Sequence, residues 1–359
     1  MTIAELVRTR LSHQRVSGQK SRNAGEVVRW MGAVQAQDYA SALWAIGVRT
    51  GNATQVSIER AIADRKIVRT WPMRGTSHFV SPSDVRWMLA YLTPRIVARA
   101  AFRFKQLELD EETFRRSGSI IEKTLGDRKF LTRDEVYALL EKNRISCKGQ
   151  RGIHILWRLA QDGVVCCGPR DGKQQTFVLL DEWVPSQKKN LRDEALANFA
   201  ERYFNSHGPA TEKDFAWWTG LTIGEARTIL EAAKSHLHAV TLGGQTYWSG
   251  NQPRYLVARE TAYLLPSFDE FLVGYTDRTA LVDRRFAKRM HPGGGILSAT
   301  IILNGRVIGT WSRSAKKDSI QIRLQTFQSV NTKTRSLIEQ AAAGYGRFTG
   351  KRSNIISLK

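Results

Sequence analysis

One pattern of elements recurs three times along this chain of 359 residues and limits the folds that it can adopt. Each copy predicts a short helix, a second helix and then two strands joined by a tight turn. The leading helices are predicted over about 25–33, 132–143 and 211–220. The second helix and the hairpin are predicted over 53–65 and 66–80, over 151–163 and 164–180, and over 222–237 and 238–249. This order is the plan of a winged-helix motif, whose second helix can enter the major groove of DNA.

Helix start signals support this division into elements. Threonine followed three residues later by glutamate predicts a capping box at Thr2, Thr132 and Thr222. Ser81 precedes Pro82, and proline is favoured at the first position of a helix. We expect the predicted hairpins to turn at Asp171-Gly172 and at Gly243-Gly244.

The remaining stretches connect these copies or follow them. Two connecting helices are predicted over 83–104 and 109–126. From about residue 253 the chain becomes strand-like, over 255–275, 293–313 and 318–327, with a hairpin turn at Asn304-Gly305. A closing helix is predicted over 330–348. The sequence therefore predicts an α+β fold that ends in a small, mostly β module.

The charge balance indicates a polyanionic partner. Lys and Arg number 55 against 33 Asp and Glu, a formal net charge of +22. Nucleic acid is the first candidate, because neutralised phosphates release counterions. An anionic membrane surface is the rival, but no strongly basic amphipathic helix stands out. The three cysteines include an adjacent pair, which disfavours disulfides and favours a reducing cytosol. We expect a cytoplasmic protein, associated with the nucleoid if bacterial, with no secretory signal and no membrane span.

Residues 32–43, GAVQAQDYASAL, contain two glutamines that flank one alanine. A helix continuing through them would separate Gln35 and Gln37 by about 200°. If the chain instead becomes extended, both amides face one side and Ala36 faces the core. The polar-apolar-polar alternation favours the extended form. We therefore expect both glutamines to leave a helix end together and face a shared cleft.

Four stretches carry a resemblance to a known family: residues 32–43, 68–80, 264–278 and 303–311. In this order they resemble the AlkZ/YcaQ family of winged-helix DNA glycosylases over nearly the whole chain. The resemblance implies three tandem winged-helix motifs that form a concave basic scaffold, followed by a β-barrel-like module. The expected segments are winged helix 1 with connecting helices (1–130), winged helix 2 (131–187), winged helix 3 (188–252) and the C-terminal module with its helix (253–359).

The resemblance also implies a catalytic role for Gln35 and Gln37, in the Gln-X-Gln form of the AlkZ-like branch. The implied reaction is hydrolysis of the N-glycosidic bond of alkylated purines, with bulky adducts and interstrand crosslinks left open as substrates. A purine alkylated at N3 or N7 is cationic and leaves without a general acid, and the sugar passes through an oxocarbenium-like state. Two amides can hold the attacking water near C1′ by accepting and donating hydrogen bonds. Such a site suits activated lesions and not neutral bases.

Asp38 and His78 are predicted to support the glutamines rather than react. Asp38 follows Gln37 directly and can cap a helix over the next residues. His78 lies in the first hairpin, where it can orient a water or a phosphate, although a lone strand histidine is more often structural. Asp269 can line the lesion cleft or form a supporting salt bridge, and the salt bridge is preferred. Trp217 and Trp218 are expected in the core.

Basic side chains near the predicted wings and in the loop at 283–295 are candidate DNA contacts. They are Arg69, Arg74, Lys148, Arg151, Arg278, Arg284, Arg285, Lys288 and Arg289. The same residues are also compatible with ordinary solvent-exposed charge.

Other function classes remain open or are disfavoured. The alternative to an enzyme is a non-enzymatic winged-helix DNA-binding protein or transcriptional regulator, which would need neither glutamine. RNA binding is a weaker third idea, because RRM and KH signatures are missing. We expect no metal, no cofactor and no nucleotide, since metal-ligand spacings and a P-loop are missing. Double-stranded DNA is the expected partner of a monomer, and lyase chemistry through a lysine is not excluded.

Overall fold

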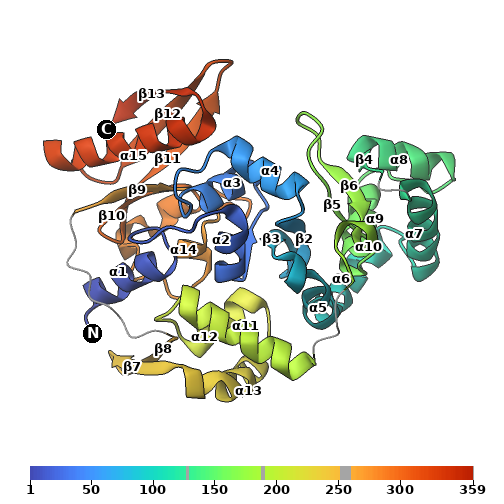
Figure 1. Cartoon of the computed structure of the whole chain (residues 1–359), viewed down its shortest axis with the longest axis horizontal. Coiled ribbons are helices and arrows are strands. Elements are labelled where there is room, and N and C mark those ends of the chain that lie inside the picture. Colours follow the sequence, from blue (N-terminus) through green and yellow to red (C-terminus); the bar gives the residue numbers. More distant parts are fainter. Residues whose placement is uncertain (127–128, 187–190, 251–259, 359) are drawn as a thin grey trace. The chain divides into compact units, whose positions relative to one another are not determined.

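The computed structural model describes residues 1–126, 129–186, 191–250 and 260–358. The chain has a mixed α+β fold that packs into two compact units (Figure 1). Unit 1 combines Met1–Ile58 with Leu196–Lys359, and unit 2 is Glu59–Ala195. This grouping by packing differs from the four segments expected from the sequence, and that division stays a prediction.

Two of the predicted hairpins form one antiparallel sheet in unit 2. Its strands follow the order β3 (Thr76–Val80), β2 (Val68–Met73), β5 (Val165–Cys167), β6 (Thr176–Leu179) and β4 (Leu131–Thr132). The hairpins meet where Arg69 of β2 pairs with Cys167 of β5. Both hairpin predictions are confirmed, and Gly172 adopts the positive φ of 56° that its turn requires.

The helices of unit 2 are α5 (Pro82–Leu92), α6 (Pro94–Gln106), α7 (Glu111–Leu125), α8 (Arg133–Lys142), α9 (Arg151–Gln161) and α10 (Leu180–Trp183). The single connecting helix predicted over 83–104 was wrong, because it divides into α5 and α6. Pro94 causes the break, since it has no N–H to donate and stands at the first position of α6. The other connecting helix is confirmed as α7.

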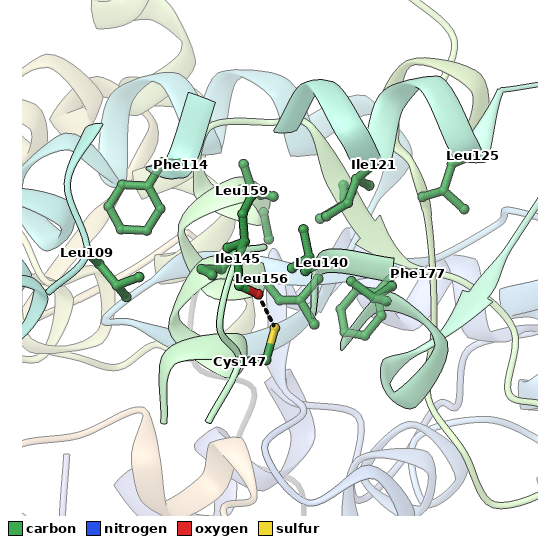
Figure 2. Packing of buried hydrophobic residues seen from close by; sticks show 14 of the residues in the cluster. Leu109, Phe114, Ile121, Leu125, Leu140, Ile145, Cys147, Leu156, Leu159 and Phe177 are labelled. Carbon is green, nitrogen blue, oxygen red and sulfur yellow. Dashed lines mark hydrogen bonds between the residues drawn. The ribbon is translucent and has the colours of Figure 1, made fainter. Parts of the chain in front are cut away.

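The core of unit 2 is an apolar cluster between α7, α8, α9 and the sheet (Figure 2). Ile155, Leu156 and Leu159 of α9 are buried in it, as their helical spacing requires. Cys147 belongs to the same cluster, with its Sγ 3.9 Å from the carbonyl oxygen of Ile145. Burial raises the pKa of the Cys147 thiol to about 11, so this sulfur stays protonated and unreactive near neutral pH. All three cysteines are buried and free.

The N-terminal part of unit 1 is helical. It contains α1 (Ile3–His13), α2 (Ala24–Met31), β1 (Ala33–Gln35) and α3 (Tyr39–Gly47), and α4 (Gln55–Ala63) begins there. Later helices are α11 (Arg192–Ser206), α12 (Glu212–Thr219), α13 (Ile223–Ala233) and the 3₁₀ turn η1 (Lys234–His236). The third hairpin is confirmed as β7 (His238–Leu242) and β8 (Gln245–Ser249), with Gly243 and Gly244 at φ 58° and 76°.

A five-stranded sheet forms the C-terminal part of unit 1. Its order is β13 (Arg352–Leu358), β12 (Ser319–Thr326), β11 (Arg306–Ala315), β10 (Thr300–Leu303) and β9 (Ala262–Leu265). β12 and β13 run parallel and the other neighbours antiparallel. In this order β9 and β13 are the edge strands of an open sheet, whereas a closed barrel would pair them.

Several predictions for this part are confirmed and some were wrong. The turn at Asn304-Gly305, the strand at β12 and the closing helix α15 (Thr332–Thr349) are confirmed. Of the stretch 255–275, residues 255–259 lie outside the described residues. The rest forms β9 and then the short helix α14 (Glu270–Val273), where strand was predicted. Strand β13 was not predicted, and the loop predicted at 283–295 contains the 3₁₀ helix η2 (Arg284–Met290).

Helix caps follow the sequence closely. The capping boxes at Thr2, Thr132 and Thr222 are all formed, each with its glutamate three residues later. Pro82 opens α5 as predicted, and Ser81 stands at the N-cap. The Ser81 hydroxyl bonds the Ser83 hydroxyl at 2.8 Å and no helix N–H.

Candidate active site

The segment with the two glutamines begins at a forced turn after α2. Gly32 has φ 79°, a left-handed conformation that favours glycine. A Cβ at this position would lie 2.9 Å from the Phe199 ring and 3.3 Å from the Trp218 ring, closer than packing allows. The chain therefore leaves the helix at Met31, and β1 is extended as far as Gln35.

Strand β1 ends at Gln35, Gln37 lies in a bend, and the two glutamines differ in exposure. Gln35 is 9% exposed, Ala36 is fully buried and Gln37 is exposed. Asp38 is the N-cap of α3, and its carboxylate accepts the Ser41 N–H at 2.8 Å, which confirms the predicted cap. The buried alanine is thus confirmed, and the extended backbone is confirmed as far as Gln35. A cleft shared by both glutamines stays a prediction.

A buried carboxylate holds the backbone of Gln35. The Gln35 N–H donates to Glu270 Oε1 at 2.7 Å, and the indole N–H of Trp218 donates to Glu270 Oε2 at 2.8 Å. Glu270 and Trp218 are both fully buried. One carboxylate therefore joins the end of β1 to α12 through two charge-assisted hydrogen bonds, which are stronger than neutral ones.

The neighbouring carboxylate forms the salt bridge preferred from the sequence. The two terminal nitrogens of Arg49 each donate a 2.8 Å hydrogen bond to a carboxylate oxygen of Asp269. Both side chains are almost completely buried. Arg49 also donates to Gln14 Oε1 at 2.7 Å. Gln14 in turn donates to the Tyr275 hydroxyl at 3.1 Å and to the Glu270 carbonyl at 3.3 Å. We name these five residues and Trp218 the buried polar network.

His207 adjoins this network. Its ring stacks on Tyr203 at 4.7 Å, its Nδ1 lies 2.8 Å from Ser206 Oγ, and its Nε2 lies 3.7 Å from Glu270 Oε2. Burial lowers the pKa of His207, and the nearby Glu270 opposes this effect only in part. The imidazole is therefore mostly neutral near pH 7, and it packs as a polar aromatic ring rather than as a cation.

The predicted supporting histidine lies in unit 2. His78 is fully buried on β3, with Nδ1 2.9 Å from the Thr76 carbonyl and Nε2 3.2 Å from an Arg74 nitrogen. Arg74 stands in the β2–β3 turn at φ 53°. The structure thus brings His78 and Arg74 together, while a supporting role for His78 toward the glutamines stays a prediction.

Three of the predicted DNA contacts are engaged by the protein itself. Arg69 donates to Gln175 at 2.7 Å and to Ser77 at 3.3 Å. Arg151 donates to the carbonyl oxygens of residues 107, 108 and 146. Arg278 donates to the carbonyl of residue 272 at 2.7 Å, and burial lowers its pKa. These guanidinium groups have structural partners, and their contact with DNA stays a prediction.

Five further predicted DNA contacts lie at the surface. Lys148, Arg284, Lys288 and Arg289 are exposed. Arg285 is also exposed and forms a 2.7 Å salt bridge with Asp283. These exposed side chains are better suited to bind phosphate than the first set. They would give up fewer hydrogen bonds within the protein when they contact DNA.

The structure also differs from the sequence interpretation in the tryptophan pair. Trp218 is fully buried, as predicted, but Trp217 is 50% exposed. Its indole N–H still donates to the Val273 carbonyl at 3.1 Å. The roles of Glu270 and Gln14 were not predicted from the sequence. Two adjacent acids within the apolar stretch LLPSFDEFLV are a signal for buried, partnered carboxylates.

Among the described residues, His, Cys, Asp and Glu side chains form no cluster that could hold a metal ion. Within those residues, the helices also lack the length and apolar character that crossing a membrane requires.

Comparisons with known proteins agree with the resemblance seen in the sequence. The family described as "DNA glycosylase AlkZ-like" matches residues 28–348. An interstrand DNA cross-link repair glycosylase of Streptomyces sahachiroi is 26% identical over 332 residues, 84% of this chain and 85% of the relative. The solved structure of Streptomyces sahachiroi DNA glycosylase AlkZ superposes with a TM-score of 0.80 at 22% identity, over 99% of this chain and 100% of the other, which shows a shared fold. The chain belongs to the AlkZ-like family of DNA glycosylases, enzymes that hydrolyse the N-glycosidic bond.

Proposed function

We propose that this glycosylase removes cationic N-alkylated purines from double-stranded DNA, with Gln35 and Gln37 holding the attacking water. The observation that supports this most directly is the local geometry. Gln35 is the last residue of strand β1, and Gln37 lies two residues further on at the surface. The alanine between them is buried, and the Gln35 backbone is bonded to Glu270. Neutral amides can orient water without titrating, and that is sufficient where the leaving base already carries positive charge.

Bulky adducts and interstrand crosslinks are included in the proposal as substrates. The relative from Streptomyces sahachiroi is named an interstrand DNA cross-link repair glycosylase. A crosslinked base cannot rotate freely into a closed pocket, so such a substrate requires hydrolysis without full base flipping. Membership of a glycosylase family disfavours the alternative of a non-enzymatic regulator.

The proposed scaffold is a set of three winged-helix motifs that act on DNA as a monomer. Their helices and hairpins are α2 and α4 with β2–β3, α8 and α9 with β5–β6, and α12 and α13 with β7–β8. The proposed limits are 1–130, 131–187 and 188–252, followed by the C-terminal module from 253. Residues at two of these limits, 187–190 and 251–259, lie outside the described residues. The net charge of +22 supports phosphate binding by this scaffold.

The test is single-turnover release of the base from duplex DNA holding one N7-methylguanine. Replacing the water-holding amide in Gln37→Ala should reduce abasic product formation by about 100-fold, within the range of positioning and proton-transfer effects. DNA affinity, measured in the same buffer, should remain unchanged. Gln19→Ala, which truncates another exposed glutamine of unit 1, is the matched control and should retain full activity.

Two outcomes would overturn parts of the proposal. Equal activity of Gln37→Ala and wild type would remove this glutamine from the mechanism. If the protein released unmodified guanine as fast as N7-methylguanine, the proposal that the substrate must be cationic would be wrong. A duplex joined by an N7 guanine crosslink, assayed in parallel, reports whether the site also accepts the bulky substrate.

A further inference from the structure

Glu270 has a position that the proposed chemistry does not explain by itself. Burying a carboxylate costs several kcal/mol unless its partners are well placed. Asp269 next to it is balanced by Arg49 in a two-point salt bridge. The two oxygens of Glu270 accept the Gln35 backbone N–H at 2.7 Å and the Trp218 indole N–H at 2.8 Å, and His207 Nε2 lies 3.7 Å from Oε2. The protein therefore places a costly charge directly against the backbone of its glutamine motif.

We propose that Glu270 is a positioning residue that fixes the direction of the Gln35 amide through the Gln35 backbone. The inference deepens the proposed function and rests on it, since it assumes that the Gln35 side chain helps to hold the water. The donor to Glu270 is the backbone N–H at the last residue of β1, so the bond controls where that residue's side chain starts. A displacement of about 1 Å in a catalytic group can cost about 100-fold in rate.

The hydrogen-bond inventory explains why this position requires a carboxylate. Two of its partners, a backbone N–H and an indole N–H, can donate a hydrogen bond but cannot accept one. A glutamine in place of Glu270 could offer its oxygen to one donor only, and its NH2 group would face the other. Ionised glutamate has acceptors on both branches. Trp218 cannot move away easily, because it is fully buried and its ring lies 5.1 Å from that of Phe199.

This inventory makes an unusual prediction about two substitutions. Glu270→Gln alone should lower kcat on N7-methylguanine DNA by about 10- to 100-fold, with KM and DNA affinity unchanged. Adding Trp218→Phe removes the second donor, so the amide oxygen can turn to the Gln35 N–H. The double variant should therefore recover at least part of the lost kcat, although it has one more change in the core.

A purely structural role for Glu270 predicts something else. In that case kcat would follow the folded fraction, and each folded variant would be as active as wild type. Leu156→Ala, a destabilising change in the core of unit 2, is the control for lost stability. Assayed well below its unfolding temperature, it should keep the wild-type kcat. Glu270→Gln, assayed at the same remaining stability, should show a reduced kcat.

A spectroscopic measurement tests the geometry without any assay of activity. In protein labelled with ¹⁵N-glutamine, the Gln35 amide resonance is identified by its loss in Gln35→Ala. A short bond to a carboxylate moves an amide proton downfield, so Glu270→Gln should shift this resonance upfield, and the double variant should shift it back. An unchanged resonance in Glu270→Gln would overturn the proposed bond.

The outcomes separate this inference from the proposed function. If Gln35→Ala and Gln37→Ala both retain activity, the glutamine mechanism fails, whatever Glu270 does. If both lose activity while folded Glu270→Gln retains the full kcat, only the positioning role of Glu270 is overturned. If Glu270→Gln fails to fold, the double variant and the resonance of Gln35 within it decide whether the amide oxygen can replace the carboxylate.

Discussion

Both units of this protein bury apolar side chains, and unit 1 also buries a network of charged and polar groups. The centre of unit 2 is an apolar cluster in which leucine, isoleucine and phenylalanine side chains pack together (Figure 2). Unit 1 buries the polar network, with a guanidinium, two carboxylates and two amide or hydroxyl groups in contact. An apolar core tolerates repacking if its volume is kept, whereas hydrogen bonds between buried polar groups require fixed directions. The unit with the glutamine motif is thus the one whose core specifies orientation.

The largest expected effect of a single substitution is in the polar network. Asp269→Ala leaves the buried Arg49 guanidinium without its carboxylate and should cost about 3–5 kcal/mol of unfolding free energy. Urea denaturation measures the loss, and hydrogen exchange by mass spectrometry should locate it in peptides of unit 1. Asp269→Asn, which retains an oxygen, should lose less. A cost below about 1 kcal/mol for the alanine variant would mean that water or rearrangement replaces the salt bridge.

A cavity in unit 2 should cost slightly less. Leu156→Ala removes a fully buried side chain and should lower the unfolding free energy by about 3 kcal/mol, within the usual range for such truncations. The same denaturation experiment applies, with faster exchange expected in peptides of unit 2. Ile153→Ala on the same helix is the control, because Ile153 is 37% exposed and should lose under about 1 kcal/mol. Equal costs at both positions would contradict the burial pattern of α9.

The third prediction concerns the pH dependence of stability that Lys20 of unit 1 causes. Lys20 donates to the carbonyl oxygens of Arg15 and Val48 at 3.1 and 2.7 Å. Burial, together with the charge of Arg49, lowers its pKa to about 7. In the unfolded chain a lysine holds its proton up to a pKa of about 10.4, so between these values the unfolded state binds more protons. Stability should therefore rise with pH across this window.

The rise due to Lys20 should be on the order of 2 kcal/mol between about pH 7.5 and 9.5. It is measured as the difference in slope between wild type and Lys20→Met, because other groups titrate equally in both proteins. The absolute stability of the variant is not the readout, since it also loses hydrogen bonds to backbone carbonyls. Parallel slopes in the two proteins would show that Lys20 remains charged when folded.

The smallest effect should be the same in both units. Thr132 in unit 2 and Thr222 in unit 1 form capping boxes of the same geometry. Replacing either with alanine should cost about 1 kcal/mol, because each change removes one acceptor for a helix N–H. Thermal unfolding in matched buffer compares the two. A large difference would mean that the cores around α8 and α13 change how much a cap contributes.

Features that depend on neighbouring residues, such as helix caps and turns, were predicted well from the sequence. Pairings between residues far apart in the sequence were not. Capping boxes, Pro82 and the paired glycines of β7–β8 depend on neighbouring residues, so they can be read from the sequence. The break at Pro94 also had a local signal that the helical pattern on both sides obscured. The strand β13 follows α15 and pairs in parallel with β12, a partner that no nearby residue reveals.

The same division applies to the candidate site. The extended backbone at Gln35 and the burial of Ala36 followed from the alternation of polar and apolar residues, and the cap at Asp38 followed from its position. The bond from Gln35 to Glu270 joins residues 235 apart in sequence. Such a pairing depends on how α14 packs near β1, and adjacent acids indicate only that some partner exists. Similarly, the exposure of Trp217 beside the buried Trp218 depends on which face of α12 is covered.

The order of Asp269 and Glu270 has a consequence for how this family can vary. Asp269 binds Arg49, which follows α3, and Glu270 binds the backbone N–H of Gln35 at the end of β1, although the two acids are consecutive. Removing one residue from the loop after β9 would bring the wrong acid to each partner. Phe268, immediately before them, already has a positive φ of 59°, so the loop has little slack to absorb such a shift. We therefore expect relatives to differ in the composition of this loop while its length is retained.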